Sequence, residues 1–166
     1  MKLSDIYIRD PFVLEENGVY YLYGTMGEYS WEGGCGFDVY TSRDLVNWSG
    51  PYPVFRPEAG FWADKNFWAP EVFKYRGSFC MLASFYKEGA MRATQILKAD
   101  SPLGPFVPIT PEPQTPADWM CLDGTLYVDG QGQPWMVFCH EWLQVTDGEI
   151  CAMPLTEDLS RAAGDP

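Results

Sequence analysis

The sequence is poor in the residues that hold transition metals and in those that bind nucleic acids. It has a single histidine among 166 residues, and no two cysteines have the CxxC spacing. Its 11 lysines and arginines are outnumbered by 23 aspartates and glutamates, which leaves a net charge of −12. Nucleic-acid partners need clustered basic residues, so the composition argues against one. The lone histidine argues against a His/Cys metal site.

Long apolar runs are also missing. No stretch reaches the roughly 18 apolar residues of a membrane-spanning helix, so we expect no contact with a membrane. The first five residues begin no signal-peptide pattern. The odd number of cysteines, three of them in apolar segments, is typical of free thiols in a reducing compartment. We therefore expect a cytoplasmic protein. The cysteines are Cys35, Cys80, Cys121, Cys139 and Cys151.

Several catalytic signatures are absent as well. The sequence contains no GxGxxG, Walker, GxSxG or HExxH pattern. Cys139 adjoins His140, but neighbours in a strand face opposite ways, so a Cys–His dyad is not expected there.

What the sequence does contain is a pattern written three times. The copies open at Asp10-Pro11, Ala69-Pro70 and Asp123-Gly124, which lie 59 and then 54 residues apart. Each opening is followed by a polar turn and an apolar, aromatic-rich segment that favours a strand. A second apolar segment and a polar turn follow in every copy. Repeats of about 50 residues with four strands each are typical of propeller blades.

We therefore predict an all-β fold, a β-propeller of four-stranded antiparallel blades with about three blades present. The chain is treated as one domain, residues 1–166, with blade-like units at 8–56, 66–110 and 119–160. No segment predicts a helix. The connectors at 51–66 and 105–119 are expected to be surface loops. Closed propellers need at least four blades. Three blades leave apolar flanks open, so we expect a homo-oligomer or a piece of a longer protein.

Asp10 and Asp123 are the leading candidates for catalysis. Equivalent blade positions converge on the propeller axis, so the two carboxylates are expected to share one centre. Two carboxylates close together move their pKa values apart, which suits acid–base work. An aspartate at such a position can equally bond its own backbone in a turn.

Further candidates lie near the same blade ends. Glu71 is one step out of phase with the two aspartates, which suggests a structural role or a place in the substrate wall. The segment His140-Glu141-Trp142 follows an apolar strand and suggests a pocket rim, with Glu141 as the acid candidate. A satisfied structural role is the alternative for His140. Among the tryptophans near loops, Trp68 and Trp142 are candidates for a sugar platform, since aromatic faces stack on sugars but also fill β cores.

Four segments taken together resemble glycoside hydrolase family 43. They are residues 8–13 (IRDPFV), 67–72 (FWAPEV), 122–129 (LDGTLYVD) and 139–142 (CHEW), and they span almost the whole chain in order. The resemblance implies a five-bladed propeller that hydrolyses arabinose- or xylose-containing glycans with inversion. It implies that Asp10 is the general base, that Asp123 tunes and orients the acid, and that Trp68 and Glu71 lie near the sugar.

The same resemblance places the general acid in a later Glu-Ala-Pro-like segment that this sequence does not contain. An axial calcium ion, held partly by a later histidine in many members, is implied as well, although no cofactor is expected to be required. An inverting enzyme needs both an acid and a base. We therefore expect a family-43-like protein that is inactive alone or depends on self-association, with Glu141 as the substitute acid within this chain. The alternative is a non-catalytic carbohydrate-binding or self-assembling half-propeller.

Overall fold

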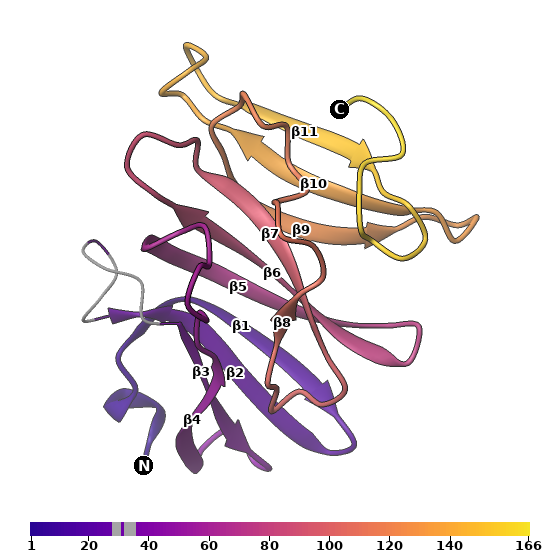
Figure 1. The fold of residues 1–166 in the computed structure, drawn as a ribbon. Helices are drawn as coiled ribbons and strands as arrows, with labels where there is room; N and C mark the ends of the chain where they lie inside the picture. The colour runs from indigo at the N-terminus through magenta and orange to yellow at the C-terminus, as the bar shows by residue number, and fades with distance from the viewer. Residues whose placement is uncertain (28–30, 32–35) are drawn as a thin grey trace.

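The computed structural model of the chain describes residues 1–27, 31 and 36–166, so Cys35 lies outside the described residues. The described residues form three antiparallel sheets in chain order, preceded by a short 3-10 helix, Leu3–Asp5 (Figure 1). The first sheet contains β1 (Ile8–Glu16), β2 (Val19–Met26), β3 (Phe37–Ser42) and β4 (Trp48–Phe55). The second contains β5 (Lys65–Tyr75), β6 (Ser78–Tyr86), β7 (Ala93–Ala99) and β8 (Val107–Pro108). The third contains β9 (Cys121–Val128), β10 (Pro134–His140) and β11 (Glu149–Pro154).

The predicted all-β architecture of successive propeller blades is confirmed. The four-strand pattern is complete in the first two sheets, whereas the third sheet has three strands in the described residues. After β11, the side chains of Thr156, Asp158 and Ser160 bond one another and the local backbone in a compact turn. This turn follows β11 where the other two sheets have a fourth strand, and it contains a single bridge between Leu155 and Ala162.

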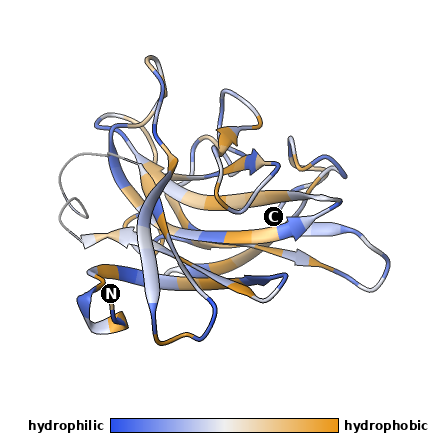
Figure 2. Ribbon diagram, turned by 90° about the horizontal axis from the view of Figure 1, so that it is seen from below, coloured by the Kyte–Doolittle hydropathy of each residue, from blue (hydrophilic) through white to orange (hydrophobic). Residues whose placement is uncertain are grey.

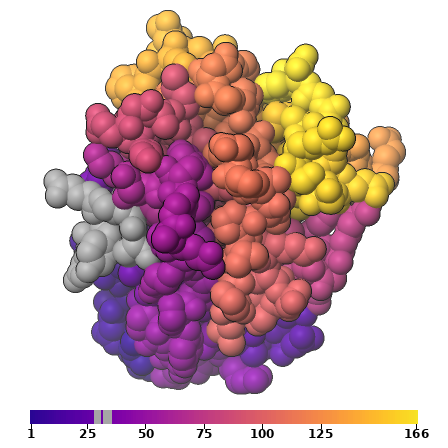
Figure 3. Space-filling view, viewed as in Figure 1, coloured from indigo at the N-terminus to yellow at the C-terminus, as the bar shows by residue number. Residues whose placement is uncertain are grey.

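The two long connectors are more ordered than the sequence predicts. β4 extends into the first of them as far as Phe55, and β8 lies in the second. Phe55 and Phe106 are both 2% exposed, because each packs into the core between the first two sheets. Figure 3 shows the connector from β7 to β9 crossing one face of the molecule, between the β4–β5 connector and the C-terminal segment. The prediction of surface loops was therefore wrong for the parts of these segments that are buried.

The second sheet is buried on both faces. Successive residues of β6 alternate between two cores: Met81 and Phe85 pack toward the first sheet, while Cys80 and Leu82 pack toward the third. This explains why β6 is buried almost throughout, whereas burial in β10 alternates residue by residue. In Figure 2 the hydrophobic colour follows the strands and many connecting turns are hydrophilic.

The inner strand of each sheet breaks its ladder at the repeated opening. The pairing register shifts between Arg9 and Phe12 in β1, between Trp68 and Glu71 in β5, and opposite Val137–Cys139 in β9. The first residue of each opening has a positive φ, 50° at Asp10, 46° at Ala69 and 54° at Asp123. Bulges of this kind re-aim a side chain out of the regular alternation. The two aspartates thus occupy the same special position in their blades.

Hydroxyl groups connect the second and third bulges to the preceding blade. The backbone N–H of Ala69 donates to Thr25 Oγ1 over 2.8 Å, and the N–H of Asp123 donates to Ser84 Oγ over 2.9 Å. Thr25 in β2 and Ser84 in β6 are 59 residues apart, the same spacing as the first two openings. Both hydroxyls are buried, so these bonds fix neighbouring inner strands against each other.

The face of the third sheet that points away from the second is incompletely covered. Met136 and Phe138 of β10 pack into the core, and the alternate residues Trp135, Val137 and Cys139 are only half-buried. Ile150 of β11 is 79% exposed. No helix among the described residues is both long and apolar enough to cross a membrane.

The close approach of the second and third sheets depends on Gly124. A Cβ added at this residue would lie 2.5 Å from Thr94 Cγ2, and Thr94 is fully buried. We therefore expect Gly124→Ala to lower the free energy of unfolding by about 1–3 kcal/mol, as overpacking commonly does.

The measurement is urea denaturation, with Gly130→Ala as the matched control, because a Cβ at Gly130 meets no atom within 4 Å. Equal stabilities of the two variants would show that the approach at Gly124 is not a packing constraint.

Candidate active site

Asp10 is held by a short chain of hydrogen bonds that starts in the neighbouring blade. Thr25 Oγ1 donates to Asp10 Oδ2 over 2.5 Å and itself accepts from the Ala69 N–H. Thr25 is fully buried, while the Asp10 side chain reaches solvent. The buried Thr25 hydroxyl therefore orients the Asp10 carboxylate, which remains accessible to solvent. A base that acts on water needs both properties.

Asp123 lies within the electrostatic reach of several other acids. The pKa of its carboxyl is raised, first because the surrounding protein removes part of its hydration and then because of the charges of Asp10, Glu71 and Glu141. The charge of Arg92 lowers this pKa. The residue is still accessible to solvent. Asp10, Glu71 and Glu141 are thus close enough to Asp123 for their charges to act on its carboxyl. A shared catalytic role for Asp10 and Asp123 stays a prediction.

Trp68 and Arg92 form the aromatic and cationic part of this centre. The Arg92 guanidinium lies 4.7 Å from the centroid of the Trp68 ring and 5.2 Å from that of Tyr86. The ring of Trp31 meets Trp68 edge-on, with centroids 5.4 Å apart, and is covered by Arg9 at 5.2 Å. Trp68 is half-buried, so part of its surface faces solvent. Its role in sugar binding stays a prediction.

Glu141 is placed differently from the other acids. It is 2% exposed, and both of its carboxylate oxygens accept from Nη1 of Arg92, at 2.5 and 2.6 Å. A general acid must carry a proton and reach the leaving oxygen. A buried carboxylate in a two-oxygen ion pair suits neither requirement, and this geometry favours a positioning role for Glu141.

His140 and Trp142 differ in their exposure to solvent. His140 is 7% exposed, stacks on Trp119 with centroids 4.2 Å apart, and shares a 2.9 Å hydrogen bond between Nε2 and Gln144 Oε1. These contacts support the structural alternative for His140. Trp142 is 68% exposed, so its ring is accessible to a ligand.

Sequence reasoning missed three residues of this centre. Thr25 and Ser84 could have been found from the sequence, since they are 59 residues apart, the same spacing as the first two openings. A hydroxyl residue inside an apolar strand is, however, easily taken as part of the core. No sequence pattern pointed to Arg92, because its partner Glu141 is 49 residues away in the chain and in another blade.

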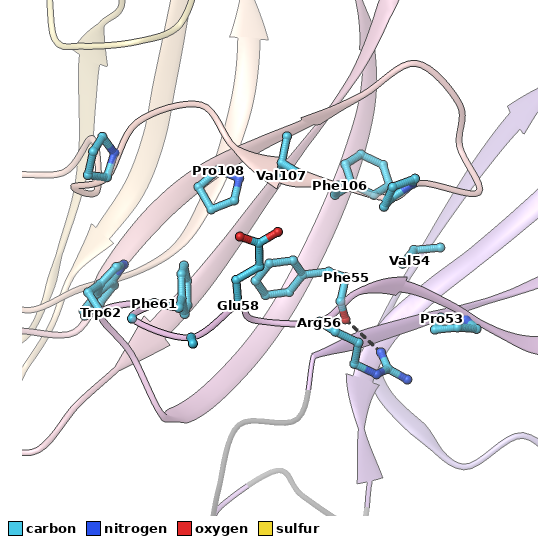
Figure 4. Close-up of a pocket in the computed structure, with 14 residues that line it drawn as sticks. Pro53, Val54, Phe55, Arg56, Glu58, Phe61, Trp62, Phe106, Val107 and Pro108 are labelled. Carbon is cyan, nitrogen blue, oxygen red and sulfur yellow. Dashed lines mark hydrogen bonds between the residues drawn. The ribbon is translucent and has the colours of Figure 1, made fainter.

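A cavity of about 560 Å³ lies elsewhere, between the β4–β5 connector and the segment around β8 (Figure 4). Its lining includes Phe55, Phe61, Trp62 and Phe106, and Glu58 points its carboxylate into it. The Arg56 guanidinium bonds the Phe37 and Phe55 carbonyls and Asp38, away from Glu58. None of the candidate carboxylates lines this cavity.

The axial ion implied by the resemblance finds no ligand set here. Within residues 1–27, 31 and 36–166, no three His, Cys, Asp or Glu side chains are grouped to hold a metal. The described cysteines, Cys80, Cys121, Cys139 and Cys151, are all free thiols.

Comparison with known proteins assigns this chain to a family. The sequence profile described as Glycosyl hydrolases family 43 matches residues 5–166. The chain belongs to glycosyl hydrolase family 43. The predicted resemblance and the propeller-type fold are thereby confirmed.

Relatives of this family-43 chain include arabinan-degrading enzymes. It is 26% identical over 172 residues to an extracellular exo-α-(1→5)-L-arabinofuranosidase of Cellvibrio japonicus, covering 94% of this chain and 46% of that protein. The structure of an endo-arabinase from Bacteroides thetaiotaomicron superimposes with a TM-score of 0.91 at 40% identity, covering 100% of this chain and 57% of the other. The structure of a thermostable family-43 glycoside hydrolase superimposes with a TM-score of 0.82 at 26% identity, covering 97% of this chain and 55% of the other. The chain thus spans about half the length of the proteins it matches.

The relay through Thr25 can be tested by removing its hydroxyl. We expect Thr25→Val to lower the free energy of unfolding by about 1–3 kcal/mol, because the buried Ala69 N–H and one Asp10 oxygen lose their partner. Thr25→Ser keeps the hydroxyl and should retain most of the stability. Urea denaturation at neutral pH measures both, and an unaffected Thr25→Val variant would contradict the relay.

The raised pKa of Asp123 makes a prediction about stability and pH. A carboxyl whose pKa is higher in the folded chain than in the unfolded chain costs stability once it is ionised, and the cost disappears below the unfolded value of about 3.9. Asp123→Asn should therefore stabilise the protein at pH 7, and this gain should shrink as the pH falls toward 4. Asparagine also tolerates the positive φ.

Denaturant unfolding of both proteins at several pH values measures this difference. A gain that is equal at pH 4 and pH 7 would show that the charge of Asp123 is not its source.

Proposed function

We propose that this chain is the base-bearing part of an inverting glycoside hydrolase that acts on arabinose-containing glycans. Asp10 is the general base and Asp123 the carboxyl that tunes the site. The observation that carries the proposal is the placement of these two aspartates on equivalent left-handed bulges, close enough for Asp10 to raise the pKa of Asp123. The names of the two arabinan-degrading relatives support arabinose over xylose as the sugar.

In the proposed step, Asp10 takes a proton from a water molecule as that water attacks the anomeric carbon from the face opposite the leaving oxygen. The Thr25 hydroxyl keeps the Asp10 carboxylate oriented toward the water. The bond from the anomeric carbon to the leaving oxygen breaks, and that oxygen needs a proton from an acid 6.5–9.5 Å or so from the base. We propose that this acid comes from residues outside this chain or from a second copy.

A nitrophenyl glycoside separates the two halves of this chemistry. Nitrophenolate is a good leaving group that hardly needs protonation, so the base alone can support its hydrolysis. We expect the chain to hydrolyse nitrophenyl α-L-arabinofuranoside slowly, and arabinan more slowly still by a factor of about 10²–10⁴ for the missing acid. Asp10→Asn should abolish the nitrophenyl activity, whereas Asp147→Asn, the same charge change at an exposed residue, should not.

The anomeric configuration of the first product, followed by proton NMR, tests inversion directly. Retained configuration, or turnover that survives Asp10→Asn, would remove Asp10 from the role of base.

A second candidate function is carbohydrate binding without turnover. The observation that favours it is the buried Arg92–Glu141 ion pair, which engages the carboxylate that was the candidate substitute acid. It predicts binding of an arabino-oligosaccharide in calorimetry, unchanged by Asp10→Asn, with no product formed over a long incubation.

The incompletely covered face of the third sheet supports self-association as part of this proposal. Trp135 and Val137 would be buried against a second copy, which hides apolar surface from water. Light scattering on the chain alone tests this, and a monomer at all concentrations would rule out self-association as the source of the acid.

A further inference from the structure

Arg92 contacts several parts of the candidate site. It lies in the connector between β6 and β7, at the end of the second blade nearest to the third. Its side chain is 11% exposed and the paired Glu141 side chain 3% exposed, so the ion pair between the two blades is buried. Nη2 also donates to Asn66 Oδ1 over 3.3 Å.

The backbone of Arg92 is fixed by the strand that carries Asp123. Its carbonyl accepts from the Cys121 N–H over 2.8 Å, and its N–H donates to the Met120 sulfur. Asp123 follows two residues later in β9. Arg92 is therefore tied to β9 through its main chain and to the segment after β10 through its side chain.

The same guanidinium supports the aromatic part of the site. It lies against the faces of both Trp68 and Tyr86, so its position limits the positions that the Trp68 ring can take. The planar guanidinium suits this contact better than a lysine ammonium would. A displaced Arg92 would release Trp68 and Glu141 together.

Arg92 is also the cation among the charges that act on Asp123. The groups around that carboxyl are Asp10 from β1, Glu71 from β5, Glu141 after β10 and the Cys139 thiol of β10, with Arg92 opposing the three carboxylates. Loss of the Arg92 charge leaves only acids there. Loss of the Glu141 charge leaves Arg92 unopposed by its partner.

We propose that Arg92 is a positioning residue that fixes the Trp68 ring and, balanced by Glu141, sets the charge around Asp123. Any catalytic importance of Arg92 rests on the proposed function. The test is independent of that function, because the titration of Asp123 can be followed without any turnover.

A second ion pair in the same two blades provides the control. Arg76 in the β5–β6 turn pairs with Glu157 of the third blade at 2.8 Å, and its guanidinium lies 5.6 Å from the Tyr75 ring. This pair repeats the chemistry of Arg92 and Glu141, but both side chains are more than half exposed. An effect shared by both arginines would be a general effect of linking the blades.

The experiment follows the carboxyl ¹³C signal of Asp123 against pH in the full chain. The signal is assigned as the one lost in Asp123→Asn. We expect Arg92→Met to raise the Asp123 midpoint and Glu141→Gln to lower it, each by about half a pH unit or more. The double variant Arg92→Met/Glu141→Gln should return close to the original midpoint, and Arg76→Met should change nothing.

Circular dichroism and urea unfolding establish that each variant is folded. If Arg92→Met does not fold because Glu141 is left buried and unpaired, Glu141→Gln and the double variant carry the same comparison. Arg92→Lys keeps the charge but not the planar stack. It should leave the Asp123 midpoint in place and weaken binding of an arabino-oligosaccharide several-fold.

An Asp123 midpoint that moves equally in Arg92→Met and Arg76→Met, or that does not move in Arg92→Met or Glu141→Gln, would overturn the inference. Failure of the proposed function looks different. In that case Asp10→Asn leaves hydrolysis of the nitrophenyl arabinofuranoside unchanged, while the Asp123 midpoint still responds to Arg92.

Discussion

The site depends on one repeated backbone feature, a left-handed residue that interrupts the inner strand of each sheet. For a residue with a side chain this conformation costs about 1–2 kcal/mol, so three copies need compensation. Part of the compensation is visible in the buried bonds from the Ala69 and Asp123 N–H groups to Thr25 and Ser84. The strain and the bonds that hold it lie where the blades meet, and the two aspartates occupy equivalent bulges.

Electrostatics at that centre follows from the same convergence. Acids that are far apart in the chain, such as Asp10, Glu71 and Asp123, act on one another because each lies in the inner strand of its sheet. Their mutual repulsion opposes ionisation of Asp123. Arg92 counters it from a position where water is largely excluded, and Glu141 in turn keeps the arginine from being an unpaired buried charge. The balance needs all three blades in place.

Much of the fold could be read from the sequence because it is written in local patterns. The apolar segments at 19–24 and 78–85 became β2 and β6, and the Asn17-Gly18 and Arg76-Gly77 turns have the positive φ values of tight hairpins. The buried connectors were misjudged, because their prolines and glycines suggest loops whether or not those loops pack. Phe55 and Phe106 are buried by contacts between two sheets, which no local pattern reports.

The sequence by itself determined the blade architecture, the family and the special status of Asp10 and Asp123, because a repeat carries the same physical demands into each copy. Only the tertiary structure decided the environment of those acids. Arg92 and Glu141 form an ion pair between two blades, and Thr25 bonds both Asp10 and Ala69. No neighbouring residue in the chain predicts either contact. Pairings of this kind are set by how sheets pack around an axis, and charge and burial at the site follow from that packing.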